Sequence, residues 1–145
     1  MHPDASRTLF EEEVAALSSR LLQQRSWTLN TATFPLIDVT FGASGRTSLR
    51  VQLHCENWND LPPSISLHVA NGTFLTTLWS DPTSVFNGSA HPATGRPFVC
   101  MAGSLEYHTH SSHLGDSWGP RRTDPRFTLF GIATQVWHAW RRGSG

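Results

Sequence analysis

An alternation of apolar and polar residues near the middle of the chain constrains the fold more than any other feature. From Ser48 to Cys55 every second residue is apolar, namely Leu49, Val51, Leu53 and Cys55. Side chains of a β-strand point alternately to its two faces, so this pattern predicts a strand with one buried face. Cys55 lies on the apolar face and is therefore expected to be a core thiol rather than a reactive one.

Three more strands are predicted, two before this one and one after it. Runs of β-branched and aromatic residues, separated by turn residues, predict strands at Trp27–Phe34, Leu36–Phe41 and Ser64–Val69. The glycines at positions 42 and 45 suit a hairpin connection. We expect the four strands to form one antiparallel sheet.

Helices are predicted at both ends of the chain. Residues 4–24 carry apolar side chains at three- and four-residue steps, and Phe127–Trp140 has a similar pattern. The order of helix, four strands, a long irregular segment and helix is typical of an α+β fold. The chain has 145 residues, of which 38% are hydrophobic, so we expect one packed core and a single domain over residues 1–145.

The charge balance and the N-terminal residues bear on partners and localisation. Eleven basic residues balance eleven acidic ones, so neither a nucleic acid nor an anionic membrane is an expected partner. There is no apolar run of roughly 18 residues that would span a membrane. Residues 1–13 lack the basic and apolar regions of a signal peptide, which favours a cytoplasmic protein with reduced cysteines. A Cys55–Cys100 disulfide is the alternative for an exported protein.

The segment His91–Trp118 contains most of the residues that are able to do chemistry. It holds one of the two cysteines, four of the eight histidines and two carboxylates. These residues are Cys100, His91, His108, His110, His113, Glu106 and Asp116. Thiol, imidazole and carboxylate groups act as nucleophiles, proton carriers and metal ligands near neutral pH. Any one of them alone is most simply a surface or core residue, but their density between positions 100 and 113 indicates a site.

Several motifs, taken in order, resemble the ubiquitin-conjugating-enzyme (UBC) fold. The stretch LRVQLHCENWNDLPPSISL is similar to the family's third strand, proline-rich link and fourth strand. His91-Pro92 followed by Cys100 resembles the His-Pro entry to the family's active-site cysteine, and Trp118-Gly119-Pro120 is similar to its Trp-Ser-Pro. The resemblance implies a UBC-like α+β fold with Cys100 and His91 as catalytic candidates. Ala93 stands where the family has an asparagine that stabilises the oxyanion.

A second resemblance concerns the residues after Cys100. Cys100, Glu106 and the His-x-His-x-x-His run at positions 108–113 resemble the bacterial CEHH family, a predicted metal-binding domain named for a cysteine, a glutamate and two histidines. That resemblance implies a place in a bacterial ubiquitin-like protein conjugation pathway. The implied partners are a ubiquitin-like protein and its activating or conjugating enzymes.

The residues themselves also suit a zinc site. If residues 104–110 are extended, Glu106, His108 and His110 project from one face. His113 joins His110 if the chain then turns helically. With Cys100 these residues offer the thiolate, carboxylate and imidazole ligands that suit tetrahedral Zn²⁺, and one histidine is left over for another role.

Other roles for the same cluster stay open. Cys100 is expected either to carry a ubiquitin-like protein as a thioester, with a neighbouring histidine as base oriented by Glu106, or to belong to a structural cluster in a non-catalytic UBC-like adaptor. A metal-dependent hydrolase with Glu106 as base is a further alternative, although one carboxylate then has two roles. The last alternative is a protein-interaction module that carries out no chemistry.

Overall fold

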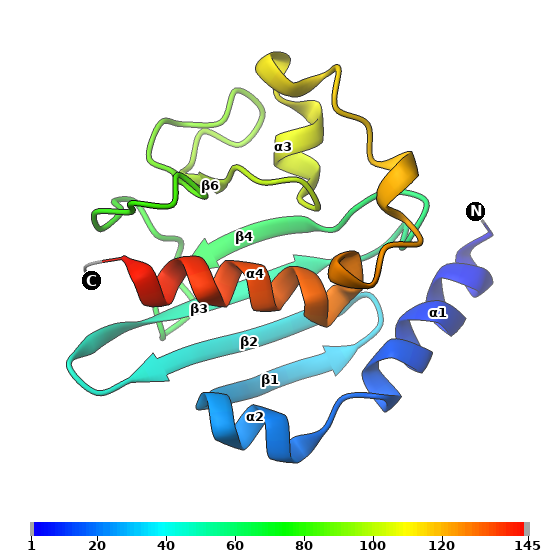
Figure 1. The fold of residues 1–145 in the computed structure, drawn as a ribbon, viewed down its shortest axis with the longest axis horizontal. Helices are drawn as coiled ribbons and strands as arrows, with labels where there is room; N and C mark the ends of the chain where they lie inside the picture. Colours follow the sequence, from blue (N-terminus) through cyan, green and yellow to red (C-terminus); the bar gives the residue numbers. More distant parts are fainter. Residues whose placement is uncertain (1, 144–145) are drawn as a thin grey trace.

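The computed structural model describes residues 2–143 and has an α+β architecture (Figure 1). Two helices come first, a four-stranded antiparallel sheet follows, and a long helix ends the chain. The main elements are α1 (Pro3–Ala15), α2 (Ser19–Arg25), β1 (Trp27–Thr33), β2 (Leu36–Ala43), β3 (Arg46–His54), β4 (Ser64–His68), β5 (Phe86–Asn87), β6 (Phe98–Val99), α3 (Leu105–Thr109) and α4 (Leu129–Arg142). The predicted α+β class, the four-stranded antiparallel sheet and the helix after it are confirmed.

The four predicted strands form one sheet in the order β1-β2-β3-β4. In the register of β3, Leu53 lies opposite Ile37 on one side and Ile65 on the other. These side chains are buried together with Val51, as the alternation predicts. Cys55 is 1% exposed, so its prediction as a core thiol is confirmed. Burial also raises the pKa of this thiol far above its ordinary value.

Helix α4 packs across one face of the sheet, and its buried side is part of the core (Figure 1). The prediction placed this helix at 127–140, whereas it begins at Leu129, after the short 3₁₀ turn η3 (Pro125–Phe127). The Thr128 hydroxyl caps α4 by accepting the Gly131 N–H at 3.1 Å. A Cβ at position 131 would lie 2.6 Å from the Arg126 carbonyl oxygen, so glycine is required there despite its low helix propensity.

The N-terminal helix is two helices instead of the single one predicted over 4–24. Ser18 interrupts the pattern because its hydroxyl caps α2, accepting the Leu21 N–H at 3.3 Å. Glu13 fixes α1 to the rest of the fold. Its carboxylate accepts hydrogen bonds from the Trp58 indole at 2.5 Å and from the Leu129 N–H at 2.8 Å.

Beyond β4 lie the β5–β6 pair and α3 (Figure 1). The β5–β6 pair is a separate two-stranded sheet that the sequence pattern did not predict. Residues 105–109 are helical rather than extended, because the Ser104 hydroxyl caps α3 by accepting the Tyr107 N–H. Glu106, His108 and His110 therefore do not project from one face of a strand, as the predicted zinc geometry requires.

Among residues 2–143, no helix has the length and apolarity needed to cross a bilayer.

Candidate functional site

Cys100 lies directly after β6, where the chain leaves the small sheet. Its N–H donates to the Val85 carbonyl at 2.6 Å, and its side chain is partly exposed. The Sγ atom lies 3.5 Å from Nε2 of His113. Burial raises the pKa of the Cys100 thiol, while a hydrogen bond from the Asn87 side chain acts in the opposite direction. Cys100 thus differs from Cys55 in having both partial exposure and polar partners.

His113 is held beside the thiol by its ring and its backbone. It ends the 3₁₀ turn η1 (Ser111–His113), and its N–H donates to the His110 carbonyl at 2.9 Å. The imidazole stacks on the Tyr107 ring of α3, with the centroids 4.1 Å apart and the planes at 17°. The imidazole is therefore oriented toward Cys100 by an aromatic neighbour rather than by a carboxylate.

Tyr107 is itself fixed by Asp116. The phenol donates to an Asp116 carboxylate oxygen at 2.6 Å, and Arg121 pairs with the same carboxylate. The hydrogen bond to Asp116 raises the pKa of Tyr107, while the Tyr107 and Arg121 bonds lower the pKa of Asp116. A row of side chains thus extends from Arg121 through Asp116 and Tyr107 to His113 and Cys100.

Two of the predicted histidines bind backbone groups instead of facing the thiol. His108 Nδ1 lies 2.8 Å from the Asp116 carbonyl, and its Nε2 accepts the Gly103 N–H at 3.0 Å. His91 is 4% exposed, with Nε2 3.0 Å from the Glu106 carbonyl and Nδ1 accepting the Ala93 N–H at 3.1 Å. Each ring therefore donates from one nitrogen and accepts at the other. Both side chains hold the local backbone in place through these hydrogen bonds.

Glu106 points away from Cys100, toward β4. One carboxylate oxygen accepts the Ser64 hydroxyl at 2.7 Å, and the other accepts the Ile65 N–H at 2.7 Å. The residue is 5% exposed. Its carboxylate therefore joins α3 to the edge strand of the main sheet.

His110 lies between the Cys100–His113 pair and the histidines that bind backbone groups. Its Nδ1 accepts the Ser112 N–H at 3.2 Å, and its ring stacks on Phe98 with a centroid distance of 5.7 Å. The ring centroid is 6.0 Å from that of His113. His110 thus lines the edge of the Cys100–His113 pair without joining it.

The five residues of the predicted zinc site do not converge on one point in this arrangement. Cys100 and His113 approach one another, whereas Glu106 and His108 are bonded elsewhere. In the part of the chain that is described, no group of three or more His, Cys, Asp or Glu residues is placed to hold a metal ion. Zinc binding stays a prediction, and direct measurement of metal content is its test.

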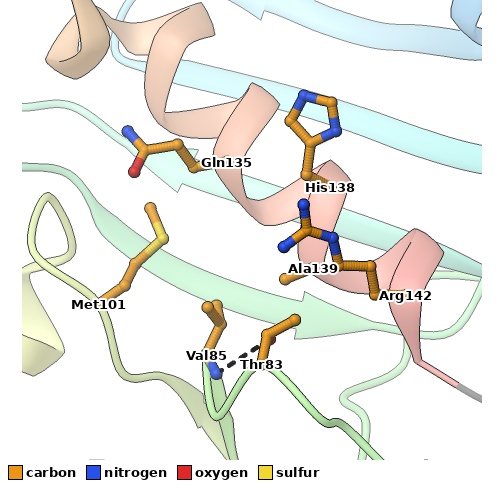
Figure 2. Close-up of a pocket in the computed structure, with 7 residues that line it drawn as sticks. All are labelled: Thr83, Val85, Met101, Gln135, His138, Ala139 and Arg142. Atoms are coloured by element: carbon orange, nitrogen blue, oxygen red, sulfur yellow. Dashed lines mark hydrogen bonds between the residues drawn. The ribbon is translucent and has the colours of Figure 1, made fainter.

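A cavity of about 350 Å³ lies next to the backbone of the site (Figure 2). Figure 2 shows residues of α4 on one side of the cavity, among them Gln135, Ala139 and Arg142, and Val85 and Met101 on the other. Val85 accepts the Cys100 N–H, and Met101 follows Cys100 in the chain. The cavity therefore adjoins the peptide segment that carries the thiol.

Neither Asn87 nor Tyr107 is predicted from the sequence to have a role at the site. The Asn-Gly pair at positions 87–88 predicts only a turn. Tyr107 stands among histidines, with no periodic pattern of apolar residues around it. Their roles depend on the strand pairing of β5 with β6 and on the turn after α3. Neither feature has a sequence pattern of its own.

A scan against protein-family models finds no match for this chain, and a search of curated proteins finds none either.

Proposed function

We propose that the protein is a UBC-like component of a bacterial ubiquitin-like protein conjugation pathway, and that it carries the modifier on Cys100 as a thioester. The order of motifs around His91-Pro92, Cys100 and Trp118 supports a UBC-like fold, and the α+β architecture agrees with it. A cytoplasmic setting suits this role because it keeps the thiol reduced. The partners are the ubiquitin-like protein and its activating enzyme.

The observation that carries this proposal is the contact between the Cys100 sulfur and His113 Nε2, at 3.5 Å. Thiol nucleophiles are activated by an adjacent base whose orientation is fixed by a third group. The stacked Tyr107 ring supplies that orientation to His113. The second cysteine, Cys55, is buried in the core and has no comparable partner among the described residues.

The reaction is a transfer of an acyl group between two thiols. His113 Nε2 takes the proton of Cys100, and the thiolate attacks the carbonyl carbon of the incoming thioester. The new carbon–sulfur bond forms, the old one breaks, and the leaving thiolate takes the proton back from His113. Burial raises the pKa of the Cys100 thiol, so a base beside the sulfur is needed to form the nucleophilic thiolate.

Ubiquitin carrying a C-terminal mercaptoethanesulfonate thioester tests the proposal without an activating enzyme. We expect wild-type protein to form a covalent adduct that dithiothreitol removes. Cys100→Ala should form none, and Cys55→Ala should behave like the wild type. A wild-type protein that is folded and forms no adduct would refute the thioester role and favour the non-catalytic adaptor.

The role of His113 is tested with a neighbouring histidine as control. His113→Ala should slow adduct formation roughly 100-fold, which is typical of losing a general base. His110→Ala should have little effect because its Nδ1 is bonded to Ser112 in its own turn. Equal loss in both variants would show that the segment, rather than the base, was disturbed.

A further inference from the structure

A second pocket lies on a different face of α4 from the cavity in Figure 2. Helix α2, the β2–β3 hairpin and the C-terminal end of α4 (Figure 1) all line this pocket, which has a volume of about 320 Å³. Helix α4 contributes Trp137, Trp140 and Arg141, whose three- and four-residue spacing places them on one side of the helix. The pocket shares no residue with the Cys100 site.

Two arginine side chains of this pocket are held against one aromatic ring. The guanidinium carbon of Arg25 lies 4.9 Å from the centroid of the Trp137 ring, and that of Arg141 lies 4.8 Å from it. Arg25 also donates from Nη1 to the Thr134 hydroxyl at 2.7 Å. A guanidinium that lies over a ring keeps N–H groups at its edge for hydrogen bonds. Two cations with free donors are thus fixed at one pocket.

Neither Arg25 nor Arg141 has a carboxylate partner within residues 2–143. Five other arginines each form an ion pair with an aspartate or a glutamate, namely Arg7, Arg50, Arg121, Arg122 and Arg126. Burial lowers the pKa of Arg25, and no opposite charge offsets it. The pKa of His138 is lowered by burial and then by the charges of Arg25, Arg142 and Arg141. Positive charge therefore gathers at this end of α4.

The C-terminal end of a helix ordinarily disfavours an anion, and here Arg46 offsets that effect. Its Nη1 donates to the Trp140 carbonyl at 2.7 Å and also to the Gly143 carbonyl. A cation bound to the last carbonyls compensates the negative end of the helix dipole. The charge that the pocket presents is therefore that of its arginines.

We propose that the Arg25–Arg141 pocket binds the phosphate group of a small phosphate monoester. Such a group carries about −1.5 to −2 charges near pH 7 and has three acceptor oxygens. Two guanidiniums match that charge, and their planar forks suit the phosphate oxygens. The Ser44 hydroxyl and the Gln24 amide also line the pocket and make no hydrogen bond within the described chain, so both can donate to the ligand. The volume of the pocket suits a small molecule.

Isothermal titration calorimetry of the intact chain with phenyl phosphate tests the inference, and benzoate is the control anion. Phenyl phosphate is a small monoester, whereas benzoate has the same ring but a single charge. We expect saturable binding of phenyl phosphate at a single site and roughly 10-fold weaker binding of benzoate. Equal affinity for the two anions would overturn the inference, and so would the absence of saturable binding of phenyl phosphate.

Variants place the binding at this pocket. Arg141→Gln should weaken binding of phenyl phosphate roughly 10-fold or more, because a hydrogen bond between charged groups is lost. Arg141 makes no hydrogen bond within the described chain, so this variant should fold like the wild type. Arg25→Gln should show a similar loss. Arg96→Gln is the matched control, because Arg96 also lacks a carboxylate partner within residues 2–143 and lies over the Phe74 ring, at 3.8 Å. Equal weakening in all three variants would indicate general charge attraction and overturn the inference.

Vesicles of phosphatidylcholine and phosphatidic acid present the same phosphate monoester on a lipid. We expect wild-type protein and Arg141→Gln to co-sediment with them equally little. Binding to the vesicles without binding to phenyl phosphate would overturn the assignment to a small molecule. The thioester experiment on Cys100 is decided independently, because the two sites have no residue in common.

Discussion

At the scale of single residues, the two cysteines show how much the surroundings decide a thiol's chemistry. Cys55 and Cys100 are both free, and burial raises the pKa of both. Cys55 is nearly inaccessible, whereas Cys100 is partly exposed and has His113 beside it. Only Cys100 combines access with groups that move protons or donate hydrogen bonds.

The raised pKa of Cys100 predicts a particular pH dependence for its alkylation. Iodoacetamide reacts with the thiolate, and a raised pKa means that less thiolate is present at a given pH. The midpoint of the pH–rate curve should therefore lie above about pH 8.5, the ordinary pKa of cysteine. Cys55 should stay unmodified in the folded protein. Mass spectrometry of the two cysteine peptides over a pH series measures both, and a Cys100 rate that levels off near neutral pH would contradict the prediction.

At the scale of elements, α3 is held in place by bonds that reach across the sequence. Glu106 ties α3 to β4, His91 ties the 91–93 turn to α3, and His108 ties α3 to the turn at residue 116. The three residues predicted as site residues thus position the loop that presents His113. Their contribution to the site is indirect.

Glu106→Ala tests this structural role. The change leaves the Ile65 N–H and the Ser64 hydroxyl without their carboxylate partner, and hydrogen bonds to charged groups contribute about 1.5–3 kcal/mol each. We expect the free energy of unfolding in urea to fall by about 3 kcal/mol. Glu56→Ala, at an exposed position, is the control and should change little. If Glu106→Ala keeps full stability and instead loses bound zinc, Glu106 is a metal ligand.

The elements differ in how well the sequence predicts them. The four strands and α4 follow from periodic burial, which depends on local spacing. The β5–β6 strands have two residues each and α3 has five, too few for a period to be visible. The direction of each histidine is set by partners such as Gly103 and the Glu106 carbonyl, and these come together only once the chain is folded. The density of the cluster was therefore predictable, whereas its geometry was not.

At the scale of the whole molecule, a polar network on the sheet joins three strands around one buried carboxylate. Asp38 of β2 is 2% exposed and accepts hydrogen bonds from Asn30 of β1 and from Arg50 and Gln52 of β3. Burial alone would raise the pKa of Asp38, but the bonds from Arg50, Asn30 and Gln52 outweigh it and hold the pKa below its ordinary value.

Asp38→Asn should therefore destabilise the protein in a pH-dependent way. Near neutral pH we expect a loss of about 3 kcal/mol, because a buried ion pair is broken and Arg50 keeps some contact with water. An acid with a lowered folded pKa contributes stability above its unfolded pKa and loses it as the pH falls through the folded value. The difference between variant and wild type should thus shrink below about pH 4.

Urea unfolding at several pH values measures the effect of Asp38→Asn. The control is Asp4→Asn, at an exposed position in α1. A difference from wild type that is constant between acidic and neutral pH would contradict the assigned ionisation of Asp38.

The central claim is that Cys100 is an acyl acceptor, and the position of the acyl group tests it most directly. After reaction with the ubiquitin thioester, digestion and mass spectrometry should place the ubiquitin C-terminal remnant on the peptide that contains Cys100, in a linkage that dithiothreitol cleaves. A remnant on a serine, on the N-terminal amine or on Cys55 would contradict the account. So would a Cys100 that stays unmodified and is instead protected by about one equivalent of bound zinc.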